Sequence, residues 1–301
     1  MMEKLKGFSI AALSVLILSP DSLLVRIISM DSLPLLFWRG IGLSSILFLY
    51  MLIRYGGSAF SMVRNLPSDG IVAAVFFSGS SIFFIVSLNL THVANTLAII
   101  SIGPLIGAVM TYTLLGEAVT RRTWIVSVLA VGCVSLIVSG GIGQMNFLGD
   151  FAALANAICL AMAIVYMRRG RSVSMVPAMV VSGLITALIA LASSPSLIPE
   201  QKDAVWLAIL CFGVIPLSFG LIAVAPRFIS APELNAFLLL EMVLGPFFVW
   251  LVLKEQPPAL TLLGGGLLFA LLGAHFLLSL KDDRARLRRE RQEIAGLEAA
   301  S

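Results

Sequence analysis

Apolar runs long enough to cross a bilayer follow one another along almost the whole chain. A membrane-spanning helix needs about 20 predominantly apolar residues. Glycine and proline stand at the breaks between the runs, as in Gly56-Gly57 and Pro257-Pro258. The sequence therefore predicts an all-α polytopic membrane protein with ten transmembrane helices, over residues 7–29, 34–54, 69–90, 93–115, 121–140, 148–168, 174–193, 204–226, 232–253 and 259–280.

The composition supports a membrane protein and argues against a nucleic-acid-binding one. Hydrophobic residues make up 59% of the chain and charged residues only 12%, whereas a soluble domain usually carries about 25% charge. The net charge of +4 comes from short basic clusters between apolar runs, so no basic face is available for nucleic acid. We expect membrane lipids and a small-molecule substrate as partners, and no nucleic acid; the sequence does not indicate an oligomeric state.

Lys4 and Lys6 precede the first apolar run, as the charged start of a signal peptide would. The run continues beyond the usual apolar region of a signal peptide, and no A-x-A-like cleavage site interrupts it. We therefore expect the first run to be retained as a span.

The distribution of basic residues predicts the orientation, because cytoplasmic loops of membrane proteins are enriched in Lys and Arg. With the N-terminus and the C-terminus in the cytoplasm, the outer loops contain only Lys202 and Lys254, and Arg26 and Arg39 fall within spans. The remaining sixteen lie on the cytoplasmic side, at 4, 6, 54, 64, 121, 122, 168, 169, 171, 227, 281, 284, 286, 288, 289 and 291. We expect a multi-pass protein of the cytoplasmic (inner) membrane. Residues 281–301 would form a cytoplasmic basic tail, acting either as a topological anchor or as a contact for anionic headgroups.

Ten spans divide into two sets of five, and an odd number of spans in each set makes the two repeats inverted. A shift of 138 residues aligns Gly107 with Gly245 and Glu117 with Glu255, without a gap. We therefore predict a first repeat over 7–140 and a second over 148–280.

The repeated motifs resemble a known family. Leu114-Leu115-Gly116-Glu117 follows Pro104 in the first half, and Leu239-Leu240-Glu241 leads to Gly245-Pro246 and Lys254-Glu255 in the second. This pattern, together with Arg39 early in the second span, resembles the EamA-type transporters of the drug/metabolite transporter superfamily over about residues 7–280. This sequence departs from the family pattern at three places. They are Ser19-Pro20-Asp21 in the first span, Met242 where the family usually has proline, and Lys254 where it usually has glycine.

The resemblance implies a secondary transporter that moves an amino acid or similar small metabolite by alternating access, with efflux as the expected direction. Uptake or exchange, for example of a nucleoside derivative, is the alternative. A membrane-embedded enzyme is a less favoured reading, because His92 and His275 have no catalytic partner at a suitable spacing. Cys133, Cys159 and Cys211 lack metal-site spacing. We therefore expect no enzyme activity, no metal and no cofactor.

Ionisable residues within spans are the strongest candidates for a transport site, because each costs at least about 2.5–3.5 kcal/mol near mid-bilayer on insertion scales. Glu241 lies within roughly 3 Å of the midplane of its predicted span. No Lys or Arg stands three or four residues away on the same helix. We predict that Glu241 lines the substrate cavity and couples transport to protons; a helix-packing carboxyl is the alternative.

Other polar or helix-breaking residues complete the predicted cavity. Pro20 removes a backbone hydrogen bond beside Asp21, which favours either a broken helix lining the cavity or a kink with Asp21 paired to Arg26 or Arg39. Arg39 would hold a substrate carboxylate or pair at the outer end of its span. Pro104 predicts a mid-span kink, and two amides would contact substrate or a neighbouring helix, Asn95 and Asn156.

Overall fold

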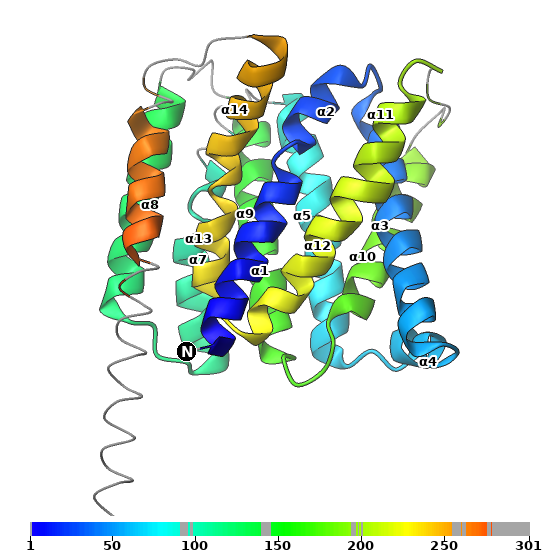
Figure 1. Cartoon of the computed structure of the whole chain (residues 1–301), viewed down its shortest axis with the longest axis horizontal. Helices are drawn as coiled ribbons and strands as arrows, with labels where there is room; N and C mark the ends of the chain where they lie inside the picture. Colours follow the sequence, from blue (N-terminus) through cyan, green and yellow to red (C-terminus); the bar gives the residue numbers. More distant parts are fainter. Residues whose placement is uncertain are drawn as a thin grey trace, which may run out of the picture.

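A computed structural model describes residues 2–90, 96, 99–139, 146–193, 197, 199, 201–254, 260, 263–275 and 278. The regular structure of these residues is entirely helical. The helices stand side by side and run between an upper and a lower face (Figure 1). The tail 281–301 lies outside the described residues.

Each of the ten predicted segments contains a described helix. The first half has α1 (Met2–Leu18), α2 (Asp21–Ile27), α3 (Ser32–Tyr55), α4 (Ser58–Arg64), α5 (Ser68–Leu90), α7 (Gly103–Met110), the π-helix η1 (Thr111–Leu115) and α8 (Arg121–Ser139). The second half has α9 (Phe147–Arg169), α10 (Val176–Ser193), α11 (Ala204–Ala208), the π-helix η2 (Ile209–Val214), α12 (Ile215–Val224), the short 3₁₀ turn η3 (Ala225–Arg227), α13 (Ala231–Leu238) and α14 (Glu241–Leu253). A last apolar helix covers Leu263–His275.

Length and composition make several of these helices suitable for crossing a membrane. Five are long and apolar enough: Glu3–Val25, Ser32–Tyr55, Ser68–Ser87, Phe147–Arg169 and Ala204–Arg227. Three more are apolar but shorter: Gly103–Leu115, Val176–Ala192 and Leu263–His275. The chain is therefore a membrane protein with several apolar helices, and the count of ten crossings stays a prediction.

Two predicted spans are interrupted at positions that match the predicted repeat. Turns at 101–102 and 239–240 separate helical segments in the fourth and ninth spans, 138 residues apart. The same tight hydrogen bond forms in both: Ile102 N donates to Ile99 O (3.2 Å) and Leu240 N donates to Phe237 O (3.0 Å). Pro104 was predicted to kink a continuous helix. Instead it lies in the first turn of α7, where a missing N–H costs nothing, and the break precedes it.

The same spacing relates the ends of these two spans. Gly116 follows η1 with φ 64° and ψ 9°, and Lys254 follows α14 with φ 59° and ψ 16°. Both are left-handed C-caps, and their numbers again differ by 138. The first end lies at the lower face, where Glu117 contacts Arg168 (3.4 Å). The second lies at the upper face (Figure 1).

Lys254 is the only described non-glycine residue with a positive φ, so its replacement tests this backbone feature. A left-handed residue with a Cβ is disfavoured by about 1–2 kcal/mol. We expect Lys254→Gly to raise the free energy of unfolding by up to about 1 kcal/mol, and Gly116→Ala to lower it by a similar amount. Thermal unfolding in detergent measures both changes. A lower melting temperature for Lys254→Gly would contradict this account.

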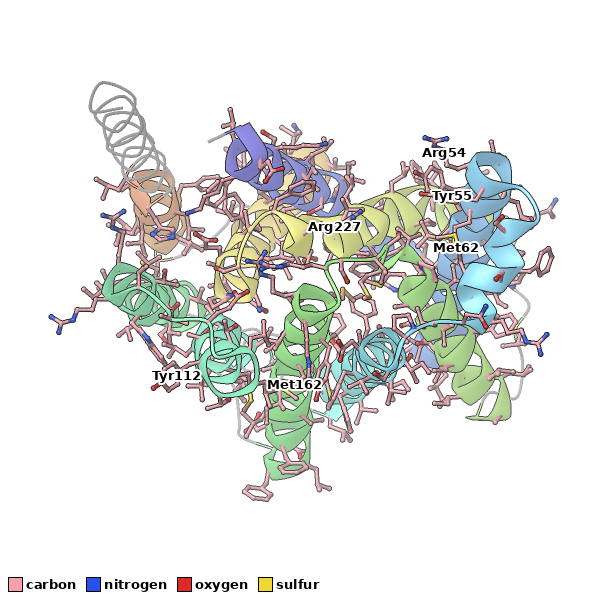
Figure 2. The ribbon with its side chains drawn as sticks, turned by 90° about the horizontal axis from the view of Figure 1, so that it is seen from below. Arg54, Tyr55, Met62, Tyr112, Met162 and Arg227 are labelled. Atoms are coloured by element: carbon pink, nitrogen blue, oxygen red, sulfur yellow. The ribbon has the colours of Figure 1, made fainter. Side chains whose placement is uncertain are left out.

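The lower face joins loops that the charge distribution predicts to be cytoplasmic. Arg168 contacts Glu117 and donates to the carbonyl of Pro226 (2.9 Å). Arg171 also contacts Glu117 (3.4 Å), and Lys4 contacts Glu233 (3.6 Å). Figure 2, viewed from below, also places Arg54 and Arg227 on this face.

The upper face joins segments that the same prediction places outside. Ser29 N donates to Asp203 Oδ2 (2.9 Å), and Trp38 Nε1 donates to the carbonyl of Leu197 (2.8 Å). These contacts connect the end of the first span and the start of the second with the loop before α11. The described parts of the predicted inner and outer loops thus lie on opposite faces of the molecule.

α3 and α10 cross in close contact at two glycines, Gly40 and Gly183. A Cβ added to Gly40 would lie 2.6 Å from the carbonyl oxygen of Gly183, and a Cβ added to Gly183 would lie 2.6 Å from that of Gly40. The next contacts are also reciprocal, to Ala187 N (2.8 Å) and Ser44 N (2.9 Å). Backbone therefore meets backbone at this crossing, as small residues permit between membrane helices.

We expect Gly183→Ala to destabilise the protein, because the added methyl group meets backbone atoms that cannot rotate away. Overpacking of this kind typically costs about 1–3 kcal/mol. Gly132→Ala, in α8, is the matched control, since a Cβ there meets no atom within 4 Å. Melting temperatures in detergent should fall for the first variant and stay level or rise for the second. Equal melting temperatures would show that the two helices separate without cost.

Candidate functional site

A buried ion pair connects the first two spans. Arg39 donates through Nη1 to Asp21 Oδ1 (2.5 Å) and through Nη2 to Oδ2 (2.9 Å). The side chains are only 14% and 10% exposed. This two-point geometry is the strongest form of a guanidinium–carboxylate contact. The predicted pairing of Asp21 with Arg39 is therefore present in the structure.

The break at Ser19-Pro20 positions Asp21. α1 ends at Leu18, the chain makes one turn, and Asp21 is the first residue of α2. Proline lacks the N–H that a continuous helix would use. The predicted broken helix is therefore present, and the carboxylate of Asp21 lies at the first residue after the break.

Glu241 occupies the corresponding place in the ninth span. It is the first residue of α14, immediately after the turn at 239–240, and α14 contacts α2. Glu241 is close enough to Asp21 and Arg39 to interact electrostatically with both. No described residue forms a hydrogen bond or a salt bridge with its carboxyl group.

The charges of this cluster do not balance. With both carboxyl groups ionised, Asp21, Arg39 and Glu241 carry a net charge of −1, and the guanidinium is already engaged by Asp21. The positive end of the α14 dipole lies beside Glu241 and favours a negative charge there. The Asp21–Arg39–Glu241 cluster can therefore accept one further positive charge, from a proton or from a cationic group.

The irregular eighth span forms another wall of the cluster. Cys211, in the π-helix η2, is fully buried, and η2 packs against α3, the helix that carries Arg39. A Cβ added to Gly42 of α3 would overlap the carbonyl group of Cys211, so the two helices touch one turn beyond Arg39. π-helical segments are rare and are frequent at functional sites.

The other predicted residues lie in helix contacts or outside the described residues. Asn156 accepts a hydrogen bond from Ser80 Oγ (2.6 Å) between α9 and α5. Gly245 is buried in α14, and only the backbone of Pro246 is described, in the same helix. Asn95 and Glu255 lie outside the described residues. The structure therefore brings together Pro20, Asp21, Arg39 and Glu241, and places Asn156 in a hydrogen bond between two helices.

One buried amide side chain, near the turns at 101–102 and 239–240, is not among the residues predicted to line the cavity. Asn235 of α13 is 3% exposed and donates to the carbonyl of Ala231 (3.0 Å). A Cβ added to Gly107 of α7 would lie 3.0 Å from its Nδ2. α7 and α13 thus pack closely across the two halves. An asparagine four residues before a break has no recognisable sequence pattern.

Two apolar hollows open between helices of the bundle. One, of about 420 Å³, is lined by residues of α3, α4 and α10 that include Phe48 and Phe60. The other, of about 270 Å³, lies between α1, α13 and the helix Leu263–His275. Neither is lined by Asp21, Arg39 or Glu241.

Comparisons with known proteins agree with this architecture. Residues 147–278 match the EamA-like transporter family, which confirms the resemblance drawn from the sequence. A crystal structure of a protein with 17% sequence identity superposes with a TM-score of 0.79, over 91% of this chain and 98% of that one. At this identity the likeness shows the fold alone. No curated protein sequence gives a significant match.

Proposed function

We propose, from the EamA-like transporter domain that its second half carries, that this protein moves a small metabolite across the cytoplasmic membrane by alternating access. The domain indicates a membrane transporter of the drug/metabolite type, and a transporter family is consistent with the expected lack of enzyme activity. The Asp21–Arg39–Glu241 cluster is the substrate and coupling site of this proposal. Efflux is the proposed direction, and uptake or exchange is the alternative.

The main structural support for this proposal is the position of Glu241. A carboxyl group at a helix break, without a salt bridge or hydrogen bond in the described structure, is costly within a membrane and is typical of ion and substrate pathways. Discontinuous helices place their half-helix ends at transporter sites in the same way. A purely structural carboxyl group would be expected to have a hydrogen-bond donor.

The two halves, 7–140 and 148–280, are proposed to be inverted repeats. The matched turns at 101–102 and 239–240 and the left-handed caps at 116 and 254 support one repeat length of 138 residues. The ends of the two spans on opposite faces support inversion (Figure 1). Inverted repeats allow the two halves to exchange conformations, so that the site opens first to one side and then to the other.

A ligand screen tests the substrate-binding part of the proposal. Purified protein would be heated with amino acids, nucleosides and amphiphilic cations in turn, since a ligand specific for the folded state raises its stability by mass action. A ligand of this site should stabilise the wild type and lose its effect in Asp21→Asn. An effect retained in Asp21→Asn would place binding elsewhere.

Cysteine labelling tests the predicted orientation. In a variant without the three native cysteines, single cysteines in 55–68 and in 281–301 should react only from the cytoplasmic side. A single cysteine in 194–203 should react only from outside. The expectation rests on the uneven distribution of Lys and Arg between the loops. Reaction of both groups from one side would overturn the ten-span topology.

A further inference from the structure

Three of the predicted spans, the fourth, the sixth and the eighth, end close together at the lower face. The loop after η1 supplies Glu117, the end of α9 supplies Arg168, and the loop after α9 supplies Arg171. Figure 2, viewed from below, places Arg227 of η3 near the middle of this face, whereas Arg54 lies toward its edge. The charged ends therefore meet where the halves of the chain adjoin.

Glu117 binds two arginines at the same time. Its Oε2 accepts a hydrogen bond from Nε of Arg168 (3.4 Å), and its Oε1 lies 3.4 Å from Nη1 of Arg171. One negative charge therefore keeps two positive charges together. The side chains of Glu117 and Arg168 are 32% and 13% exposed, so salt screens this contact less than it would screen a pair on an open surface.

The two arginines also hold the end of the eighth span. Arg168 donates through Nη1 to the carbonyl of Pro226 (2.9 Å), and Arg227 donates through Nε to the carbonyl of Arg171 (3.2 Å). Glu117 belongs to the first predicted repeat, whereas α9, the loop after it and η3 belong to the second. These contacts therefore join the two halves across the lower face.

The helix that leads to Glu117 carries a buried hydroxyl group without a partner. Thr111, the first residue of η1, is 1% exposed, and its Oγ1 has no hydrogen-bond partner among the described residues. It follows Gly107 by one turn, and a Cβ at Gly107 would lie 3.6 Å from Pro232 of α13, so this side of the helix faces the second half. Buried polar atoms nearly always have a partner. An unpaired hydroxyl between the halves is expected of a surface that water reaches in another conformation.

We propose that Glu117 keeps the lower, predicted cytoplasmic side of the protein closed, and that this side opens when Arg168 and Arg171 both release it. The inference rests on the proposed alternating access, in which one repeat moves against the other. Removing the charge of Glu117 breaks both ion pairs at once and leaves two guanidinium groups facing each other. The open conformation is then favoured, and water reaches Thr111 from the cytoplasm.

Labelling of Thr111→Cys, in a variant without the three native cysteines, tests the proposal. Inside-out vesicles would be treated with a cationic or an anionic thiosulfonate reagent, neither of which crosses the membrane. Adding Glu117→Gln should raise the labelling rate at least about fivefold with both reagents, because the closed conformation loses two ion pairs. A change in local potential alone would instead speed one reagent and slow the other.

Exchange of the charges provides a rescue. Glu117→Arg should raise the labelling rate as Glu117→Gln does. Adding Arg168→Glu restores an opposite pair and should return the rate close to that of Thr111→Cys alone. Glu3→Gln is the matched control, because it removes the same charge from an exposed residue in the first turn of α1, which begins at the lower face (Figure 1). It should leave the rate unchanged.

Labelling is measured well below the melting temperature of each variant, so that unfolding does not contribute. An unchanged rate in Glu117→Gln, an equal rise in Glu3→Gln, or a rise with one reagent only would each overturn the proposal. Labelling requires neither substrate nor flux. Faster labelling in Glu117→Gln, combined with a wild type that transports nothing, would therefore refute the proposed function and retain the role of Glu117 in closing the lower face.

Discussion

Proteoliposomes containing Glu241→Gln are expected to lose proton-driven substrate flux and retain substrate binding. Glutamine preserves the shape of the side chain and its capacity to accept a hydrogen bond, but it cannot exchange a proton. In the proposed mechanism, the Asp21–Arg39–Glu241 cluster binds either a proton or a substrate, but not both at once. When residue 241 cannot be protonated, a proton gradient can no longer drive substrate across the membrane. Flux under an imposed pH gradient should fall to the level of empty liposomes.

Two measurements make this expectation specific. A ligand identified by thermal shift should still stabilise Glu241→Gln, which shows that the protein is folded and binds. Glu3→Gln, an exposed glutamate in the first turn of α1, is the matched control and should transport as the wild type does. Flux in Glu241→Gln that keeps its dependence on pH between 6 and 8 would refute proton coupling through this residue.

Arg39→Met is expected to destabilise the protein by about 3–5 kcal/mol, the usual cost of removing one partner from a buried ion pair. It leaves two carboxyl groups, Asp21 and Glu241, facing each other without the guanidinium. Asp21→Leu should cost less, because Glu241 is close enough to serve as the remaining counter-ion of Arg39. The order of the two losses therefore tests whether Glu241 belongs to the same cluster.

Unfolding by SDS in mixed micelles would give these free energies. The double variant Asp21→Leu/Arg39→Met should recover much of the loss, since replacing both partners of a buried pair by apolar residues is often neutral. Adding Glu241→Gln to Arg39→Met should also recover stability, because it removes one of the two like charges. Equal losses in the two single variants would show that Glu241 does not compensate for Asp21.

Much of the helical arrangement follows from the sequence, because a run of about 20 apolar residues has few alternatives to a membrane helix. The break at Pro20 was also predictable, since proline removes a backbone donor. The break at Leu239-Leu240 was not. Two leucines in an apolar run favour a continuous helix, and only packing against other helices shows that the chain turns there.

The composition of the cluster was predictable in part. Charges within apolar segments identified Asp21, Arg39 and Glu241, because such residues are costly in a membrane. Their mutual arrangement depends on contacts between helices far apart in the sequence, as between α2 and α14. From the sequence, Asp21 could pair with either Arg26 or Arg39, and only the three-dimensional structure shows the contact with Arg39.

The glycine crossing of α3 and α10 has a mechanical consequence. Gly40 and Gly183 contact each other's backbones reciprocally, as a local two-fold axis between two helices requires. With no side chain between them, one helix can tilt over the other without any change of rotamer. The crossing would then act as a pivot, about which the upper and lower ends of the two helices swing in opposite directions. Arg39 is adjacent to this pivot, so its guanidinium would reorient with little displacement while distant loops move furthest.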